Sequence, residues 1–133
     1  MTSRQEPTWL SRTVVDSIHQ DQLREHGGLA GLRDENALES GLARPRHRWL
    51  HDADADLALL AAAYGFGLKQ NHPYRDGNKR VAFLTMVVFL GLNGFNLDAP
   101  DAEIVTVMVS VAAGHTLETQ LAGWLRRRMI PLE

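Results

Sequence analysis

Apolar residues recur at helical spacing, every three to four residues, along nearly the whole chain. The alternating β-branched stretches and Gly-Asn dipeptides that are typical of hairpin strands are missing from the sequence. The run 81–92 is apolar on all sides but falls well short of the ~20 residues that span a bilayer. Such a helix belongs in the buried centre of a protein. The sequence therefore predicts an all-α fold of about six helices packed around a central apolar helix.

The helix boundaries follow from capping residues, glycines and prolines. Gly27 and Gly28 should end the first helix, and Pro45 should end a short second helix that Asp34 caps. Residues 46–53 are then expected to form a loop. The helices expected in this way cover residues 11–26, 34–44, 54–71, 78–92 and 101–113, with a last helix from Thr116 onward.

The composition narrows the possible functions. The chain has 133 residues, 44% of them hydrophobic, which suits a single domain over residues 1–133. It has no cysteine, which excludes a disulfide framework and a thiolate site. The start of the chain is polar and does not resemble a signal peptide, so we expect a cytoplasmic protein without membrane association. The net charge of −2 gives no bulk attraction for nucleic acid, and no direct contact with it is expected.

Residues 71–80, Asn-His-Pro-Tyr-Arg-Asp-Gly-Asn-Lys-Arg, form a polar segment between two apolar helices. Lys79 and Arg80 fall in the first turn of the second of these helices, where the helix dipole disfavours cations. A bound anion would reverse that effect. Gly77 lets the backbone approach a ligand closely, and the free N–H groups at a helix start form a nest for phosphate. The segment therefore predicts a phosphate-binding site.

Two other side chains in this segment suit phosphate chemistry. Asp76 offers one hard oxygen ligand, and Mg²⁺ is usually held by one or two carboxylates together with substrate phosphates. His72 offers an imidazole, the side chain that most often accepts a proton from an attacking hydroxyl near neutral pH. The alternative interpretation of the same residues is a surface turn in which His72 merely caps a helix.

The string His-Pro-Tyr-Arg-Asp-Gly-Asn-Lys-Arg at 72–80 resembles the signature of the Fic fold, and with Lys after Asn it resembles the death-on-curing (Doc) toxin branch. Two further segments are similar to Doc-like proteins, and both precede the signature in the expected order. They are 31–45, with Gly-Leu-Arg-Asp-Glu at its start and Leu-Ala-Arg-Pro at its end, and 61–67, Ala-Ala-Ala-Tyr-Gly-Phe-Gly. The resemblance therefore covers most of the chain.

The resemblance implies a role for each matching residue. His72 would be the catalytic base and Asp76 the metal ligand, while Gly77, Asn78, Lys79 and Arg80 would form the anion-binding nest. It also implies that the glycine-rich residues 27–31 and the following Arg33 and Asp34 form a mobile flap, with Gly31, Arg33 and Asp34 aligning the target chain. The residues alone leave open that this stretch is only a helix stop and a cap.

The resemblance further implies an activity. Adenylylating Fic proteins usually have a second glycine in place of Lys79 and an arginine in place of Phe83, and this chain shares both departures with Doc-like toxins. We therefore expect a toxin of a type II toxin–antitoxin system that uses ATP and Mg²⁺ to phosphorylate a Ser/Thr hydroxyl, with elongation factor Tu as the target. A separate antitoxin with a disordered tail would be its partner. Two alternatives remain: a Fic-type nucleotidyltransferase that transfers AMP, and a non-catalytic regulatory or DNA-binding module.

Overall fold

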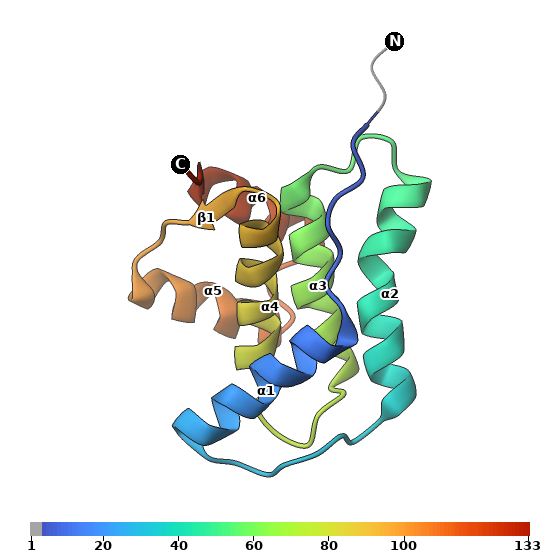
Figure 1. Cartoon of the computed structure of the whole chain (residues 1–133). Coiled ribbons are helices and arrows are strands. Elements are labelled where there is room, and N and C mark those ends of the chain that lie inside the picture. The colour runs from blue at the N-terminus through green and yellow to red at the C-terminus, as the bar shows by residue number, and fades with distance from the viewer. Residues whose placement is uncertain (1–3) are drawn as a thin grey trace.

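The computed structural model describes residues 4–133, and within them six α-helices and two short strands are formed (Figure 1). In chain order they are α1 (Arg12–His26), α2 (Glu35–His51), α3 (Leu57–Asn71), α4 (Asn78–Leu92), β1 (Phe95–Leu97), α5 (Asp101–Ala112), α6 (Glu118–Arg128) and β2 (Met129–Pro131). The predicted all-α class is confirmed. No helix within residues 4–133 is both long and apolar enough to cross a bilayer.

Most helix boundaries lie where the local signals predicted them. Ser11 caps α1 by accepting a hydrogen bond from the Val14 amide, and Asp34 caps α2 by accepting one from the Ala37 amide. The bounds of α4 agree with the prediction at both ends. Helix α3 begins slightly later than expected, because Asp56 rather than Asp54 supplies the capping carboxylate.

Helix α3 packs against α2, α4 and α6 and so shares the central position that the sequence assigned to 78–92 alone. Its small residues permit close contacts with both neighbouring helices. A Cβ at Gly65 would lie 2.4 Å from the Met86 sulfur of α4, and one at Gly67 would lie 3.4 Å from the Gly41 carbonyl oxygen of α2. By contrast, α4 is buried on one side only, and Phe83 and its neighbours on the outer side remain half-exposed.

The prediction that the second helix ends before Pro45 is wrong, because α2 continues through Pro45 to His51. Proline lacks the amide that would bond the carbonyl four residues earlier and disfavours a helix interior. Here tertiary packing overrides that cost. Pro45 is buried, and Arg44 before it and Arg48 after it both donate to the buried carboxylate of Glu118 in α6. These contacts hold residues 46–51, expected to be a loop, in the helix.

The sequence also missed a small sheet. Strand β1 pairs antiparallel with β2, with Asn96 opposite Ile130. The Asp98 amide continues the pairing by donating to the Arg128 carbonyl. This sheet ties the end of α6 to the segment that follows α4, near the C-terminus in Figure 1.

Helix α5 is fixed near both of its ends. Glu103 in its first turn accepts hydrogen bonds from Trp124 and Arg128 of α6. At its other end the Lys69 ammonium of α3 donates to the Ala112 carbonyl at 2.8 Å. Between these anchors Val105 and Val109 are exposed and line a groove between α5 and α4.

Candidate active site

The polar segment after α3 turns sharply at His72. Its φ and ψ, both 52°, place it in the left-handed region, which a residue with a side chain seldom adopts. The next two residues, Pro73 and Tyr74, are buried, and Leu32 forms an antiparallel bridge with Tyr74. The Arg33 and Asp34 amides both donate to the Pro73 carbonyl. The segment is therefore held against the core while the His72 side chain is exposed.

The Arg33 side chain caps the end of α3. Its Nε donates to the His72 carbonyl at 2.6 Å, and its terminal nitrogen donates to the Asn71 carbonyl at 2.8 Å. A cation is favourable at this position because a helix C-terminus carries partial negative charge. Arg33 thereby stabilises the unusual backbone conformation of His72.

Backbone groups hold the Asp76 carboxylate from two sides. Its Oδ1 accepts a hydrogen bond from the Gly77 amide at 2.9 Å, and its Oδ2 accepts one from the Leu29 amide at 3.2 Å. Gly28 packs so closely that a Cβ there would lie 2.6 Å from Oδ2. Each oxygen accepts one of these bonds and keeps a further lone pair for a cation.

Helix α4 begins with amides that the helix itself cannot satisfy. Gly77 has φ 78° and provides no side-chain cap, and the first helical hydrogen bond runs from the Val81 amide to the Gly77 carbonyl. Within residues 4–133 the amides of Asn78, Lys79 and Arg80 have no hydrogen-bond acceptor. These three donors form a ready site for an anion.

The Asn78 side chain has a structural role. It is buried, accepts a hydrogen bond from the Tyr74 amide and donates one to the Tyr74 carbonyl. Asn78 therefore faces a ligand through its backbone amide only. Its side chain closes the turn that connects α3 to α4.

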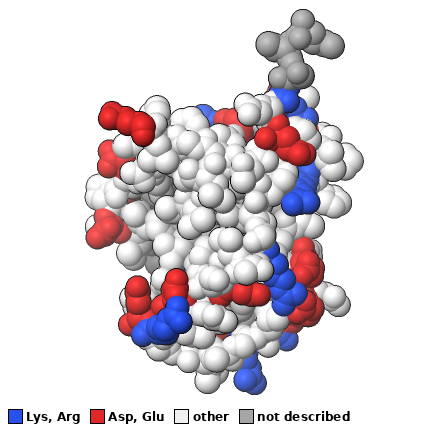
Figure 2. Space-filling view, in the orientation of Figure 1, with Lys and Arg blue, Asp and Glu red and all other residues white. Residues whose placement is uncertain are grey.

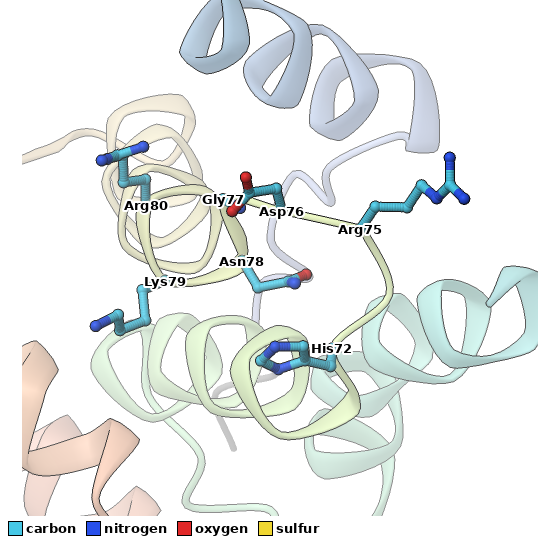
Figure 3. Close-up of a pocket in the computed structure, with 7 residues that line it drawn as sticks. All are labelled: His72, Arg75, Asp76, Gly77, Asn78, Lys79 and Arg80. Atoms are coloured by element: carbon cyan, nitrogen blue, oxygen red, sulfur yellow. The ribbon is translucent and has the colours of Figure 1, made fainter. Parts of the chain in front are cut away.

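These residues line one cleft of about 380 Å³. Its lining consists of His72, Arg75, Asp76, Gly77, Asn78, Lys79 and Arg80 (Figure 3). Lys79 and Arg80 extend to one side of the segment, and the Arg75 side chain extends away from them on the other side. The lining contains three cationic side chains and a single carboxylate, so its charge favours an anionic ligand.

The donor set suits Mg²⁺ bound together with a phosphate ligand. Asp76 is the carboxylate of this cleft, and it is exposed. Mg²⁺ keeps several waters and takes only one or two protein carboxylates when phosphates supply further oxygens. A polyphosphate on the α4 amides beside Asp76 would bring such oxygens to the same place.

The structure thus brings together the residues predicted for base, metal ligand and nest. The residues expected to form the flap make contacts of their own. Asp34 caps α2, the Gly31 carbonyl accepts a hydrogen bond from the Arg75 amide, and Arg33 contacts the end of α3. These contacts bring this segment beside the cleft, and the flap role of Gly31, Arg33 and Asp34 stays a prediction.

Sequence reasoning missed two residues that hold Asp76. Gly28 lay in a stretch expected to be mobile. His19 of α1 is 4% exposed, and its Nε2 lies 3.0 Å from the Asp76 carbonyl oxygen. One signal was present, because His19 follows the buried Val15 by four residues and so lies on the same helix face.

Comparison with known proteins identifies the family. The model of the Fic/DOC family matches residues 9–90. The protein kinase doc of Escherichia phage P1 is 30% identical over 119 residues, which cover 89% of this chain and 93% of the relative. The toxin Doc of Mycolicibacterium smegmatis is 39% identical over 75 residues, which cover 55% of this chain and 57% of the relative. The resemblance found in the sequence is confirmed, and the chain belongs to the Fic/DOC family.

Proposed function

We propose that this chain is the toxin of a type II toxin–antitoxin pair and transfers the γ-phosphate of ATP, with Mg²⁺, to a Ser/Thr hydroxyl of a target protein. The observation that carries the proposal is a single cleft that combines three unsatisfied helix-start amides, two flanking cations, an exposed imidazole and an exposed carboxylate. The names of the two relatives, a protein kinase and a toxin, agree with it.

In this mechanism His72 takes the proton of the attacking hydroxyl. The Lys69 carbonyl is only an acceptor, so the 3.4 Å contact to His72 Nδ1 requires the hydrogen on Nδ1. The neutral ring then has its lone pair on Nε2, which is the nitrogen that receives the proton. As the hydroxyl oxygen bonds to the γ-phosphorus, the bond from that phosphorus to the β–γ bridging oxygen breaks, and ADP leaves.

The remaining residues stabilise charge and fix the phosphates. The amides of Asn78, Lys79 and Arg80 bind phosphate oxygens, and the Lys79 and Arg80 side chains offset the charge on the transferred group. Asp76 would hold Mg²⁺, which neutralises the phosphates when bound. Phosphoryl transfer is catalysed mostly by such positioning and charge stabilisation.

Two residues favour phosphorylation over transfer of AMP. The Lys79 side chain occupies the position where adenylylating Fic proteins have a glycine, so the space beside α4 is narrowed. Phe83 is uncharged where an adenylylating protein has an arginine, and it lines an apolar groove with Ile104 and Met108 of α5. The residues on which an AMP transferase would rely are therefore replaced here.

The surface beside α4 is suited to binding an apolar segment of a partner protein. Figure 2 shows that the face over α4 is largely uncharged, with the charged groups near the margins. Beside it lies the groove between α4 and α5, of about 200 Å³, lined by Lys79, Arg80, Phe83, Ile104, Val105, Met108 and Val109. We propose that the antitoxin tail folds against this surface as an amphipathic helix. Elongation factor Tu is the proposed target, and the cytoplasm the proposed place of action.

Labelled ATP separates the candidate activities. Purified protein is incubated with elongation factor Tu, Mg²⁺ and ATP labelled at either the α- or the γ-phosphorus. Phosphorylation leaves only the γ label on protein, whereas AMP transfer leaves only the α label and would replace the proposal. If neither label is transferred and the chain slows the migration of a specific DNA fragment in a gel-shift assay, the DNA-binding alternative is correct.

Variants then assign the residues. His72→Ala should abolish transfer of the γ label and growth arrest without unfolding the chain, and Asp76→Asn should raise the Mg²⁺ concentration needed for half-maximal transfer. His51→Ala, an exposed histidine of α2 outside the cleft, is the matched control and should behave as the unmodified chain. A folded His72→Ala protein that still transfers the γ label would overturn the assignment of the base.

A further inference from the structure

We propose that His19 of α1 is a positioning residue, which fixes the peptide after Asp76 and thereby aims the Asp76 carboxylate into the cleft. This inference rests on the proposed role of Asp76. Because His19 is separated from the 72–80 segment by more than fifty residues in sequence, it is not part of the motif that identified the site.

The contact is buried and directional. His19 is 4% exposed, and its Nε2 lies 3.0 Å from the Asp76 carbonyl oxygen. A carbonyl oxygen only accepts, so Nε2 must carry the hydrogen. The imidazole also stacks on the Tyr74 ring, with the centroids 3.9 Å apart and the planes at 12°. His19 therefore contacts the segment at two residues, Tyr74 and Asp76.

The stacked ring is itself anchored to α1. The Tyr74 hydroxyl donates to Asp16 Oδ1 at 2.7 Å, and Asp16 lies one helical turn before His19. Arg12, a further turn back, donates to the other Asp16 oxygen at 3.3 Å. Burial and this hydrogen bond to Asp16 both raise the pKa of the Tyr74 hydroxyl, so it remains a donor at neutral pH. One face of α1 thus fixes the position and the tilt of the His19 ring.

The geometry of the peptide bond links His19 to the carboxylate. The Asp76 carbonyl and the Gly77 amide belong to one planar unit and point in opposite directions. Holding the carbonyl oxygen therefore fixes the direction of the Gly77 N–H, which donates to Asp76 Oδ1. If the carbonyl is released, the peptide plane is free to rotate, and the carboxylate loses this bond. The Asp76–Gly77 peptide directly precedes the unsatisfied amides at the start of α4. Its orientation therefore also affects the direction of these anion-binding amides.

Three variants of His19 separate the effect of its hydrogen bond to the Asp76 carbonyl from the effect of its ring stacking on Tyr74. His19→Phe keeps a flat ring on Tyr74 and removes the donor. His19→Gln removes the ring, but its amide nitrogen reaches as far as the imidazole Nε2. His19→Asn is equally polar but one carbon shorter, so it cannot reach the carbonyl. His26→Phe, on the exposed end of the same helix, is the matched control.

The first measurement is amide hydrogen exchange of the free chain by NMR, which needs neither ATP nor metal. In His19→Phe and His19→Asn the Gly77 amide should exchange about tenfold faster, as expected for the loss of one hydrogen bond. Amides in the centre of α3 should be unaffected. His19→Gln and His26→Phe should match the unmodified chain. If His19→Phe does not fold, the comparison of His19→Gln with His19→Asn still decides whether the hydrogen bond positions the peptide.

The second measurement is the Mg²⁺ dependence of γ-phosphate transfer. The half-maximal Mg²⁺ concentration should rise about tenfold in His19→Asn and return to near the original value in His19→Gln. Unchanged Gly77 exchange in His19→Asn, equal behaviour of Gln and Asn, or faster exchange throughout the core would overturn the positioning role. If the unmodified chain transfers no phosphate, the proposed function fails, and the exchange data still decide whether His19 holds the peptide.

Discussion

Replacing Gly28 by alanine tests whether the segment after α1 positions Asp76. The added Cβ would lie 2.6 Å from Asp76 Oδ2 and 3.1 Å from its Cγ. An ordinary contact begins at 3.4 Å, so the carboxylate or the backbone beside it must retreat by about 0.8 Å. Gly27→Ala is the matched control, because Gly27 also has a positive φ, of 73°, but a Cβ there would meet nothing within 4 Å.

The two variants should lose similar stability but different activity. A side chain in these sparsely populated regions of positive φ costs roughly 1–3 kcal/mol, and this cost applies to both glycines. Only Gly28→Ala also displaces Asp76. A misplacement near 1 Å at a reacting centre lowers a rate by up to ~10²-fold, so we expect γ-phosphate transfer to fall between about tenfold and a hundredfold.

Urea unfolding followed by circular dichroism gives the stability of each variant, and transfer of the γ label at saturating ATP gives the activity. The measurements are made at a temperature where both variants remain folded. Gly27→Ala should retain nearly full activity. The reasoning is refuted if Gly28→Ala transfers phosphate at the original rate, or if both variants lose activity to the same extent.

Three further predictions concern other contacts. Arg33→Met should lower γ-label transfer about tenfold by releasing the backbone of His72; unchanged transfer by the folded variant would contradict this role. Glu118→Gln should lower the free energy of unfolding in urea by about 1–3 kcal/mol, because a buried acceptor for two arginines is weakened, and an unchanged urea midpoint would show that the cluster is not stabilising. Hydrogen bonds from Trp124 and then from an arginine hold the pKa of Glu103 below its ordinary value, so its contribution to stability is present at neutral pH and is lost as the pH falls below ~4 and through the lowered pKa. Urea midpoints between pH 7 and pH 3 should therefore fall less steeply in Glu103→Gln than in the unmodified chain, and equal slopes would exclude this contribution.

The sequence predicted the helices whose ends depend on local contacts. Ser11 and Asp34 bond amides three residues ahead, and His72 ends α3 immediately before a proline, so short-range rules are sufficient there. Pro45 shows where such rules fail. The helix continues through it because of an ion cluster with Glu118, which lies seventy residues along the chain from Arg48. The strands β1 and β2 were missed for the same reason, since three-residue strands carry no usable alternation and pair only across the fold.

The candidate site likewise has a part that the sequence predicted and a part that it did not. Its motif is contiguous, so the proximity of His72, Asp76 and the start of α4 followed from the sequence. The residues that hold this motif in place come from elsewhere: His19 from inside α1 and Arg33 from the segment before α2. Their roles depend on hydrogen bonds to backbone carbonyls, and a carbonyl is present at every residue. Helical spacing places His19 on the buried face of α1, and the family resemblance pointed to Arg33, but neither pattern indicates which carbonyl each side chain contacts.

The two anchors of α5 have a thermodynamic consequence for any apolar segment that binds beside α4. With Glu103 tied to α6 and the Ala112 carbonyl tied to Lys69, the wall of the groove is already ordered in the free chain. The conformational entropy lost on binding then falls almost wholly on the incoming segment. Calorimetry should show a negative heat-capacity change that scales with the apolar area the segment buries, and shortening that segment should change affinity through the entropy of binding.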